Sequence, residues 1–399
     1  MRKITQKAVD NFSNKEIMLF IGARQAGKTT ILKQLKEAVE NKKQQTHFLN
    51  LEDPDFLTAL NQSPKNLFKI LPLNETRRSF VFIDEVQYLK NPTNFLKYLH
   101  DEHGDRIKLI VSGSSAFYLD QKFKDSLVGR KKIFFVRTLS FREFLLFKNE
   151  PELAKKDFAS LAETEKDRLR RHYDEYLIYG GYPRVVLASD NEEKKEILRE
   201  IVYSYIKKDI YESGVRQDEE FYKLLKILAS QTGQLVNRSE LAGTLRMSAP
   251  TVDHYFYILQ KSFHLCLIKP FHNNIRKELT KMPKVFFYDL GLRNFLLNDF
   301  SMPSLRSDKG TLIENAVFRQ LLEYYFDDEI KFWRTADGQE VDFILPDNRA
   351  LEAKFDASQF KSKKYAKFLE NYPQYQLSVA AYAVKEGRGA PLAREIWAL

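Results

Sequence analysis

Gly22-Ala23-Arg24-Gln25-Ala26-Gly27-Lys28-Thr29 decides the fold of this 399-residue chain. The stretch follows the apolar run Ile17–Ile21, which predicts a buried strand, and precedes Thr30–Leu35, which has the spacing of a helix. Strand, G-x-x-x-x-G-K-T and helix in this order predict a phosphate-binding loop, because glycines let backbone N–H groups surround phosphates at a helix N-terminus. The residues expected to surround the phosphates are Gly22, Ala23, Arg24, Gln25, Ala26, Gly27, Lys28, Thr29 and Thr30.

Two acidic residues are placed to complete a nucleotide-hydrolysing site. The apolar run Ser79–Ile83 predicts a strand, and Asp84 and Glu85 follow it directly. Lys28 is expected to reach the β- and γ-phosphates, while the Thr29 hydroxyl and Asp84 hold Mg²⁺. Glu85 is expected to polarise the attacking water as a general base. The pattern predicts ATP and Mg²⁺ as cofactors. The alternatives are a glycine-bearing turn matched by chance and a surface acidic pair that closes a strand.

Two further positions are candidates for contact with the transferred phosphate. A serine-rich turn follows the strand that ends near Val111, and Ser114 is expected to sense the γ-phosphate there, with Ser112 or Ser115 as alternatives. Arg130 precedes the next predicted strand and could stabilise transferring charge, in its own subunit or in a neighbouring one. The simpler interpretations are a plain strand-to-helix turn and a solvated basic run.

Charge and cysteine content restrict the partner and the compartment. The net charge of +10 and the pI of about 9.2 favour an anionic partner, above all DNA, although a general solubility charge gives the same balance. The single cysteine, Cys266, excludes an internal disulfide framework and favours a reducing cytoplasm. No apolar run reaches the roughly 18 residues of a membrane span. The charged start Met1–Lys7 lacks a following apolar segment, so we expect neither export nor membrane association.

Alternating apolar runs and helical patterns over residues 16–136 predict an α/β fold. Five candidate strands with intervening helices indicate a parallel sheet with helices on both faces, with ligands at the carboxyl ends of the strands. The predicted strands are Ile17–Ile21, Thr46–Leu51, Phe80–Ile83, Lys108–Ser112 and Lys132–Val136. We predict three domains: an ATPase domain over residues 1–150, a helical and winged-helix region over 151–270, and a nuclease-like α/β domain over 271–399.

The middle of the chain carries a helix-turn-helix pattern. Glu220–Gln231 and Asn237–Ala242 predict two helices, and Ser248 as N-cap with Pro250 in the first turn predicts a third. Phe263–Ile268 is expected to form a wing strand. A helix-turn-helix unit of this kind places the start of its third helix in the major groove of DNA.

The third helix offers little for base reading. None of its leading polar residues is Arg or Lys, so binding through the DNA backbone or its shape is expected instead. The segment Lys277–Lys284 adds positive charge nearby. The alternative is a packing module between the flanking domains. The leading residues are Ser248, Thr251, His254 and Tyr255.

A second candidate site lies near the C-terminus. Asp342 and Glu352 face each other across a predicted hairpin, and Glu352 and Lys354 share a face because side chains alternate along a strand. Glu314, on a predicted helix, could supply a third carboxylate. These three carboxylates can hold a divalent metal, while Lys354 stabilises developing charge or orients water. The alternative is an exposed hairpin with charged outward positions.

The N-terminal motifs resemble those of AAA-type P-loop ATPases over about residues 14–150. The wider layout, with Leu139–Phe144 and Tyr179–Pro183, resembles a bacterial and archaeal family whose members carry a C-terminal domain of unknown function. This resemblance implies the sheet order of additional-strand ATPases, with a winged helix behind it. The acid, hairpin and E-x-K pattern over about residues 308–399 resembles restriction-endonuclease-like nucleases and Holliday-junction resolvases. It implies a nuclease-like fold, with or without an active metal site.

Two functions follow as hypotheses. The first is an ATP-driven enzyme that acts on DNA, in which nucleotide binding switches domain position or self-association and the C-terminal domain binds or cuts DNA. The second is a nucleotide-controlled regulatory or scaffold protein, in which the winged helix and C-terminal domain hold a protein partner. Binding to DNA that weakens as salt rises separates them, because phosphate contacts are salt-sensitive.

Overall fold

The computed structural model describes residues 2–73, 77–113, 127–206, 218–272, 278, 281–384 and 393–399. Ser114 and its alternative Ser115 lie outside the described residues. The chain divides into two compact units. The first comprises Met1–Thr138 with Lys261–Phe263, and the second comprises most of the chain from Leu139 onward.

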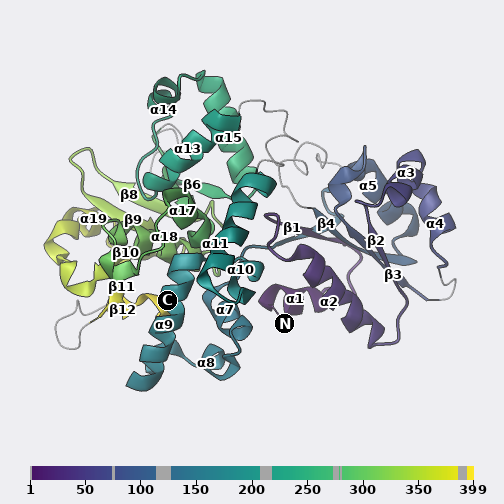
Figure 1. Ribbon diagram of the computed structural model, residues 1–399, viewed down its shortest axis with the longest axis horizontal. Coiled ribbons are helices and arrows are strands. Elements are labelled where there is room, and N and C mark those ends of the chain that lie inside the picture. The colour runs from purple at the N-terminus through teal and green to yellow at the C-terminus, as the bar shows by residue number, and fades with distance from the viewer. Residues whose placement is uncertain are drawn as a thin grey trace. The chain divides into compact units, whose positions relative to one another are not determined.

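A five-stranded parallel sheet lies at the centre of the first unit (Figure 1). Its strands follow the order β2-β3-β4-β1-β5. All five predicted strands are confirmed, with ends that differ by at most one residue. The insertion of β4 between β1 and β3 is the additional-strand order that the resemblance implied. The strands are β1 Ile17–Ile21, β2 Thr46–Asn50, β3 Ser79–Asp84, β4 Ile107–Gly113 and β5 Lys131–Phe135.

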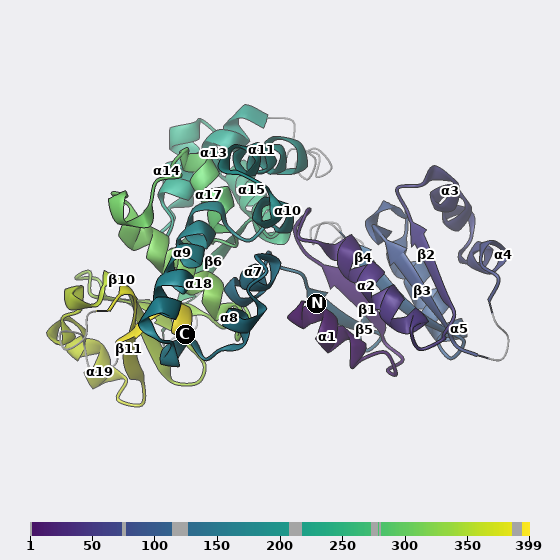
Figure 2. The same cartoon turned by 60° about the horizontal axis from the view of Figure 1, so that its bottom comes forward.

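Helices cover both faces of this sheet, because side chains along each strand alternate between two apolar clusters. Met18 and Phe20 pack with α1 and α2, and Leu19 and Ile21 pack with α3, α4 and α5 (Figure 2). Burial on both faces explains why the strands read as continuous apolar runs. The predicted α/β class is confirmed. The helices are α1 Lys3–Val9, α2 Lys28–Glu40, α3 Pro54–Gln62, α4 Leu67–Ile70 and α5 Pro92–His103.

The second unit contains a seven-stranded mixed sheet in the order β12-β11-β10-β9-β8-β6-β7. β9 and β10 are antiparallel and form the predicted hairpin. β6 pairs with β7, so the domain boundary predicted at residue 270 falls between two strands of one sheet. The strands are β6 Leu265–Pro270, β7 Lys284–Phe287, β8 Lys331–Arg334, β9 Glu340–Ile344, β10 Arg349–Asp356, β11 Gln376–Ala383 and β12 Ala393–Glu395.

Helices make up the rest of the second unit. Ser140 caps α7 together with Glu143, which confirms the predicted capping box. A π-helical segment, Ile201–Ile206, follows α11. The α-helices are α7 Phe141–Phe147, α8 Pro151–Lys155, α9 Glu163–Tyr179, α10 Pro183–Leu187, α11 Asn191–Glu200, α13 Asp218–Ser230, α14 Arg238–Leu245, α15 Ala249–Lys261, α17 Leu290–Leu297, α18 Lys309–Leu321 and α19 Ala366–Asn371.

The two family motifs seen in the sequence meet inside this unit. The Leu139 N–H donates to the Gly181 carbonyl at 2.7 Å, and the Gly181 N–H donates to Asp289 Oδ2 at 2.8 Å. Gly180 has φ +75°, and a Cβ there would lie 2.1 Å from Asp289 Oδ1. Glycine at position 180 is therefore required so that the end of α9 can approach the start of α17.

The three predicted helices of the helix-turn-helix pattern are confirmed as α13, α14 and α15. The Ser248 hydroxyl accepts the Thr251 N–H at 3.2 Å, which confirms the predicted N-cap. Tyr255 was wrongly predicted to face DNA, because it is buried and packs edge-on against Phe221 at 5.1 Å between ring centroids. Within the described ranges, no helix combines the length and apolar character needed to cross a bilayer.

Candidate functional sites

The loop between β1 and α2 has the backbone that a phosphate-binding loop needs. Gly27 adopts the left-handed conformation with φ 94°, which favours glycine, and α2 begins at the next residue. Lys28 is 5% exposed. Its Nζ donates to the carbonyls of Gly22 at 3.0 Å and Ala23 at 2.9 Å. The ammonium therefore lies against the loop itself, at the positive end of α2.

Two hydrogen bonds from Arg2, which the sequence analysis missed, fix this loop. Arg2 donates from Nη1 to the Ala26 carbonyl at 2.9 Å and from Nη2 to the Arg137 carbonyl at 2.8 Å. A Cβ at Gly22 would lie 2.0 Å from the Val136 carbonyl oxygen, so only glycine fits the close approach there. No sequence signal distinguishes Arg2 from the surface charges beside it.

Asp84 ends β3 beside the loop and lies near two hydroxyls. Ser112 on β4 donates to Asp84 Oδ1, and the Thr29 side chain lies near enough to the Asp84 carboxylate to lower its pKa. Burial raises the pKa of Asp84, while the Ser112 and Thr29 side chains oppose that rise. The predicted pair, Thr29 and Asp84, is thus brought together with the chemistry that a magnesium ion bound to a nucleotide requires.

Glu85 sits at the same edge of the sheet in an unusual conformation. Its backbone is left-handed, with φ 58° and ψ 45°, a state that costs a non-glycine residue roughly 1–3 kcal/mol. The Glu85 N–H donates to the Ser112 hydroxyl at 3.2 Å, and Gln87 donates from Nε2 to Glu85 Oε2. Ser112, one alternative to Ser114, therefore bridges the two acids. Gln87 was missed by the sequence analysis.

Arg130 lies at the wrong edge of the sheet to act on a phosphate bound in its own loop. Its carbonyl accepts the Ile17 N–H at 2.8 Å, at the start of β1, whereas the loop follows Ile21. Five strand residues separate these edges by about 16 Å. The Arg130 Nε donates to Asp101 Oδ1 at 2.6 Å instead. The interpretation in which Arg130 acts within its own subunit is therefore wrong. That Arg130 acts on a phosphate bound in a neighbouring subunit stays a prediction.

Two of the three predicted C-terminal acids, Glu314 and Asp342, converge with Glu340 and not with Glu352. Oxygens of Glu314 on α18 and of Glu340 and Asp342 on β9 lie within 4.8 Å of one another. Lys284 Nζ, from β7, lies 2.8 Å from Glu314 Oε1, 2.5 Å from Glu340 Oε1 and 3.9 Å from Asp342 Oδ1. The segment ending at Lys284 was wrongly expected to add positive charge at this position, because Lys284 is 1% exposed and paired.

Glu352 and Lys354 lie beside this cluster, on β10. Lys354 Nζ donates to Glu352 Oε1, which confirms that the two share a face of the strand. Asp342 Oδ2 accepts the Ala353 N–H at 2.9 Å, so β9 and β10 are joined at the site. Asp342 and Glu352 are buried, which excludes the alternative of an exposed hairpin.

Burial and crowding raise the pKa of two of these acids. Burial raises the pKa of Glu314 to about 8, with Lys284 opposing the shift and Asp342 and Glu340 adding to it. Burial, and after it Asp342, raises the pKa of Glu352 to about 7 against the opposing effect of Lys354. Carboxylates this close together compete for the same ammonium groups, so protonation relieves their repulsion.

The thermal midpoint of the second unit is expected to fall as pH rises from about 5 to about 8. Glu314 binds its proton more tightly when folded than at its ordinary pKa of 4.5. The folded state therefore holds more protons in this range, and stability decreases with rising pH. Glu314→Gln should flatten the dependence, measured by calorimetry at pH 5, 6, 7 and 8. The exposed Glu370→Gln is the matched control, and identical slopes in both variants would contradict the assignment.

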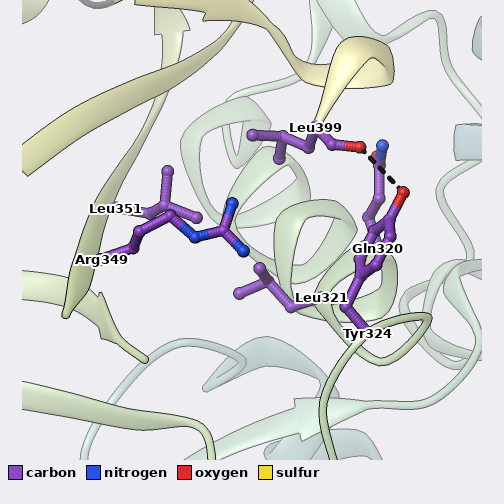
Figure 3. Close-up of a pocket in the computed structure, with 6 residues that line it drawn as sticks. All are labelled: Gln320, Leu321, Tyr324, Arg349, Leu351 and Leu399. Atoms are coloured by element: carbon purple, nitrogen blue, oxygen red, sulfur yellow. Dashed lines mark hydrogen bonds between the residues drawn. The ribbon is translucent and has the colours of Figure 1, made fainter. Parts of the chain in front are cut away.

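A cavity elsewhere in the second unit is too small to compete with these sites. It measures about 180 Å³, against roughly 300–1,000 Å³ for typical ligand pockets. Arg349 points into it (Figure 3) but is paired with Asp347 and Tyr325. The lining residues are Gln320, Leu321, Tyr324, Arg349, Leu351 and Leu399.

The sheet order, the loop and the acids of β3 give the first unit the fold of P-loop ATPase domains of the AAA type. A family profile described as "AAA domain" matches residues 14–145. Two profiles described as domains of unknown function, DUF8612 and DUF4143, match residues 170–302 and 309–397. The second unit is thus matched by families whose descriptions assign no role.

Two relatives align along most of the chain. An uncharacterised protein of Methanocaldococcus jannaschii is 27% identical over 352 residues, which covers 86% of this chain and 74% of the relative. An uncharacterised protein of Haemophilus influenzae is 26% identical over 338 residues, with 82% and 79% covered. The ATPase motifs therefore occur here within a longer shared layout.

Two solved structures show a weak similarity to this chain. The Thermotoga maritima Holliday junction branch migration motor RuvB is 18% identical, with a TM-score of 0.35, and 67% of this chain and 89% of that chain are covered. DnaA of Aquifex aeolicus bound to AMPPCP is 16% identical, with a TM-score of 0.29 and 65% and 86% covered. TM-scores of this size carry no argument about function, and the AAA assignment depends on the profile match and the sheet order.

Proposed function

We propose that the protein binds ATP with Mg²⁺ at the β1–α2 loop and hydrolyses it. The observation that carries this proposal is that the Thr29 side chain and the Lys28 ammonium both lie near enough to the Asp84 carboxylate to lower its pKa. A bound magnesium ion would neutralise phosphate charge between the Thr29 hydroxyl and the Asp84 carboxylate. Glu85 would take a proton from the attacking water, and Gln87 and Ser112 hold it in place.

We further propose that the second unit couples this ATPase to DNA. The two helices α14 and α15, separated by a short turn, support a helix-turn-helix unit, a motif that binds DNA in many proteins. The net charge of +10 supports an anionic partner. The partner is proposed to be bound and not cut, because cleavage at the C-terminal acids would need a metal where Lys284 lies.

One observation favours the alternative, a nucleotide-controlled scaffold that holds a protein partner. The only lysine or arginine in α15 is Lys261, at its far end, and Arg238 on α14 is paired with Asp253 at 2.7 Å. Few cations are therefore available at the start of the third helix for phosphate contacts. Arg246, exposed in the turn between the two helices, is the best placed of them.

Salt dependence separates the two candidate functions. Duplex DNA binding, followed by fluorescence anisotropy, is expected to weaken with salt at a log–log slope of about −0.9 for each phosphate contact. Arg246→Gln should make that slope shallower by about 1, whereas the exposed Arg199→Gln on α11 should leave it unchanged. Salt-insensitive binding, together with an ATPase rate that branched, linear and single-stranded DNA all leave unaltered, would favour the scaffold instead.

A further inference from the structure

The acidic cluster of the second unit has the form of a cation site. Glu314, Glu340 and Asp342 come from two elements, and their oxygens converge within 4.8 Å. Carboxylate oxygens gathered in this way are the ligands that magnesium and calcium prefer. The Lys284 ammonium lies among them, in contact with the first two acids and 3.9 Å from the third.

The cationic side chains around the cluster nearly balance its acids. Arg334 pairs with Glu340 at 2.8 Å, and Lys354 pairs with Glu352. With Lys284, three cations therefore meet the four carboxyl groups of this site, and burial raises the pKa of two of these groups, Glu314 and Glu352, to about 8 and about 7. A divalent ion added to this set would give it excess positive charge in a partly buried place, which is unfavourable.

Backbone pairing holds Lys284 where it is. Lys284 pairs with Ile268 in the β6–β7 ladder and forms an isolated bridge with Leu235 on its other side. Gly233, with φ +74°, approaches so closely that a Cβ would lie 2.6 Å from Glu314 Oε2. The ammonium thus enters the cluster from a fixed strand, and withdrawing it would leave a buried charge unpaired.

We propose that the Lys284 ammonium takes the place of the divalent ion in this cluster. The acids of α18, β9 and β10 then bind no Mg²⁺ and fasten the β6–β7 hairpin to the rest of the second unit. The inference is independent of the proposed ATPase activity.

Manganese binding measured by electron paramagnetic resonance tests this inference. All variants carry Asp84→Asn and are studied without nucleotide, so that the site in the first unit takes up no ion. With Lys284 in place, we expect no Mn²⁺ in the cluster. Lys284→Met, which keeps most of the length of the side chain and removes its charge, should gain one Mn²⁺ per chain. Lys284→Arg should gain none.

A second change identifies the ligands. Glu314→Gln added to Lys284→Met should remove the gained ion. A folded Lys284→Met variant that binds no Mn²⁺ would overturn the proposal. Mn²⁺ bound by the protein with Lys284 in place, and lost on Glu314→Gln, would overturn it as well. Mn²⁺ binding by the protein with Lys284 in place tests the proposal even if Lys284→Met fails to fold. A failure of ATP binding would change neither outcome.

Discussion

Lys28→Ala is expected to weaken ATP binding by about a hundredfold or more, because two charge-assisted hydrogen bonds to phosphate contribute roughly 3 kcal/mol together. In the structure the Lys28 Nζ donates to the carbonyls of Gly22 and Ala23. These bonds keep a cation at the loop, ready to exchange its partners for phosphate oxygens. Titration calorimetry with ATP and Mg²⁺ measures the change.

Lys33→Ala is the matched control for this experiment. Lys33 lies on the same helix as Lys28 but is exposed, so its removal should leave the affinity for ATP unchanged. Circular dichroism confirms that both variants keep their helices. Equal affinities of Lys28→Ala and the unaltered protein would remove the loop from nucleotide binding.

Glu85→Gln is expected to bind ATP normally and to hydrolyse it about 10²–10⁴-fold more slowly, the range that a positioned general base contributes. Glutamine preserves the shape of the side chain, and it can still accept the hydrogen bond that Gln87 donates to Glu85 Oε2. The left-handed backbone of Glu85 is therefore expected to persist. What is lost is the capacity to take a proton.

Phosphate release under saturating ATP measures this loss, with nucleotide binding measured on the same samples. Glu102→Gln is the control, because Glu102 is an exposed acid of the same unit on α5. A Glu85→Gln variant that hydrolyses ATP at the rate of the control would contradict the role of general base. A variant that also fails to bind would indicate a structural role instead.

Local patterns predicted much of the fold. The five strands of the first unit are buried on both faces, so their apolar runs stood out from the helical patterns between them. The sheet order could not come from such runs, because nothing local places β4 between β1 and β3. The sheet order was predicted only from the resemblance to AAA-type P-loop ATPases. The pairing of β6 with β7 and β8 likewise depends on long-range contacts, which the predicted boundary at residue 270 missed.

The candidate sites likewise contain residues that the local sequence predicts and residues that only tertiary contacts bring into the site. Thr29, Asp84 and Glu85 could be predicted because a motif fixes their spacing next to strands. The prediction that Arg130 acts within its own subunit was wrong, because the position of Arg130 depends on the register of β5 against β1. Lys284 was missed because a lysine between apolar residues looks like surface charge. Only the approach of β7 to α18 makes it a buried partner of Glu314.

A crystal structure with Mn²⁺ and a non-hydrolysable ATP analogue tests the central claim most directly, because anomalous scattering locates the metal. The account predicts one manganese ion, bound between the Thr29 hydroxyl, Asp84 and the phosphates, with Lys28 turned toward the phosphates. It predicts none among Glu314, Glu340 and Asp342. A structure in which nucleotide and metal are absent from the β1–α2 loop, or in which manganese displaces Lys284, would contradict it.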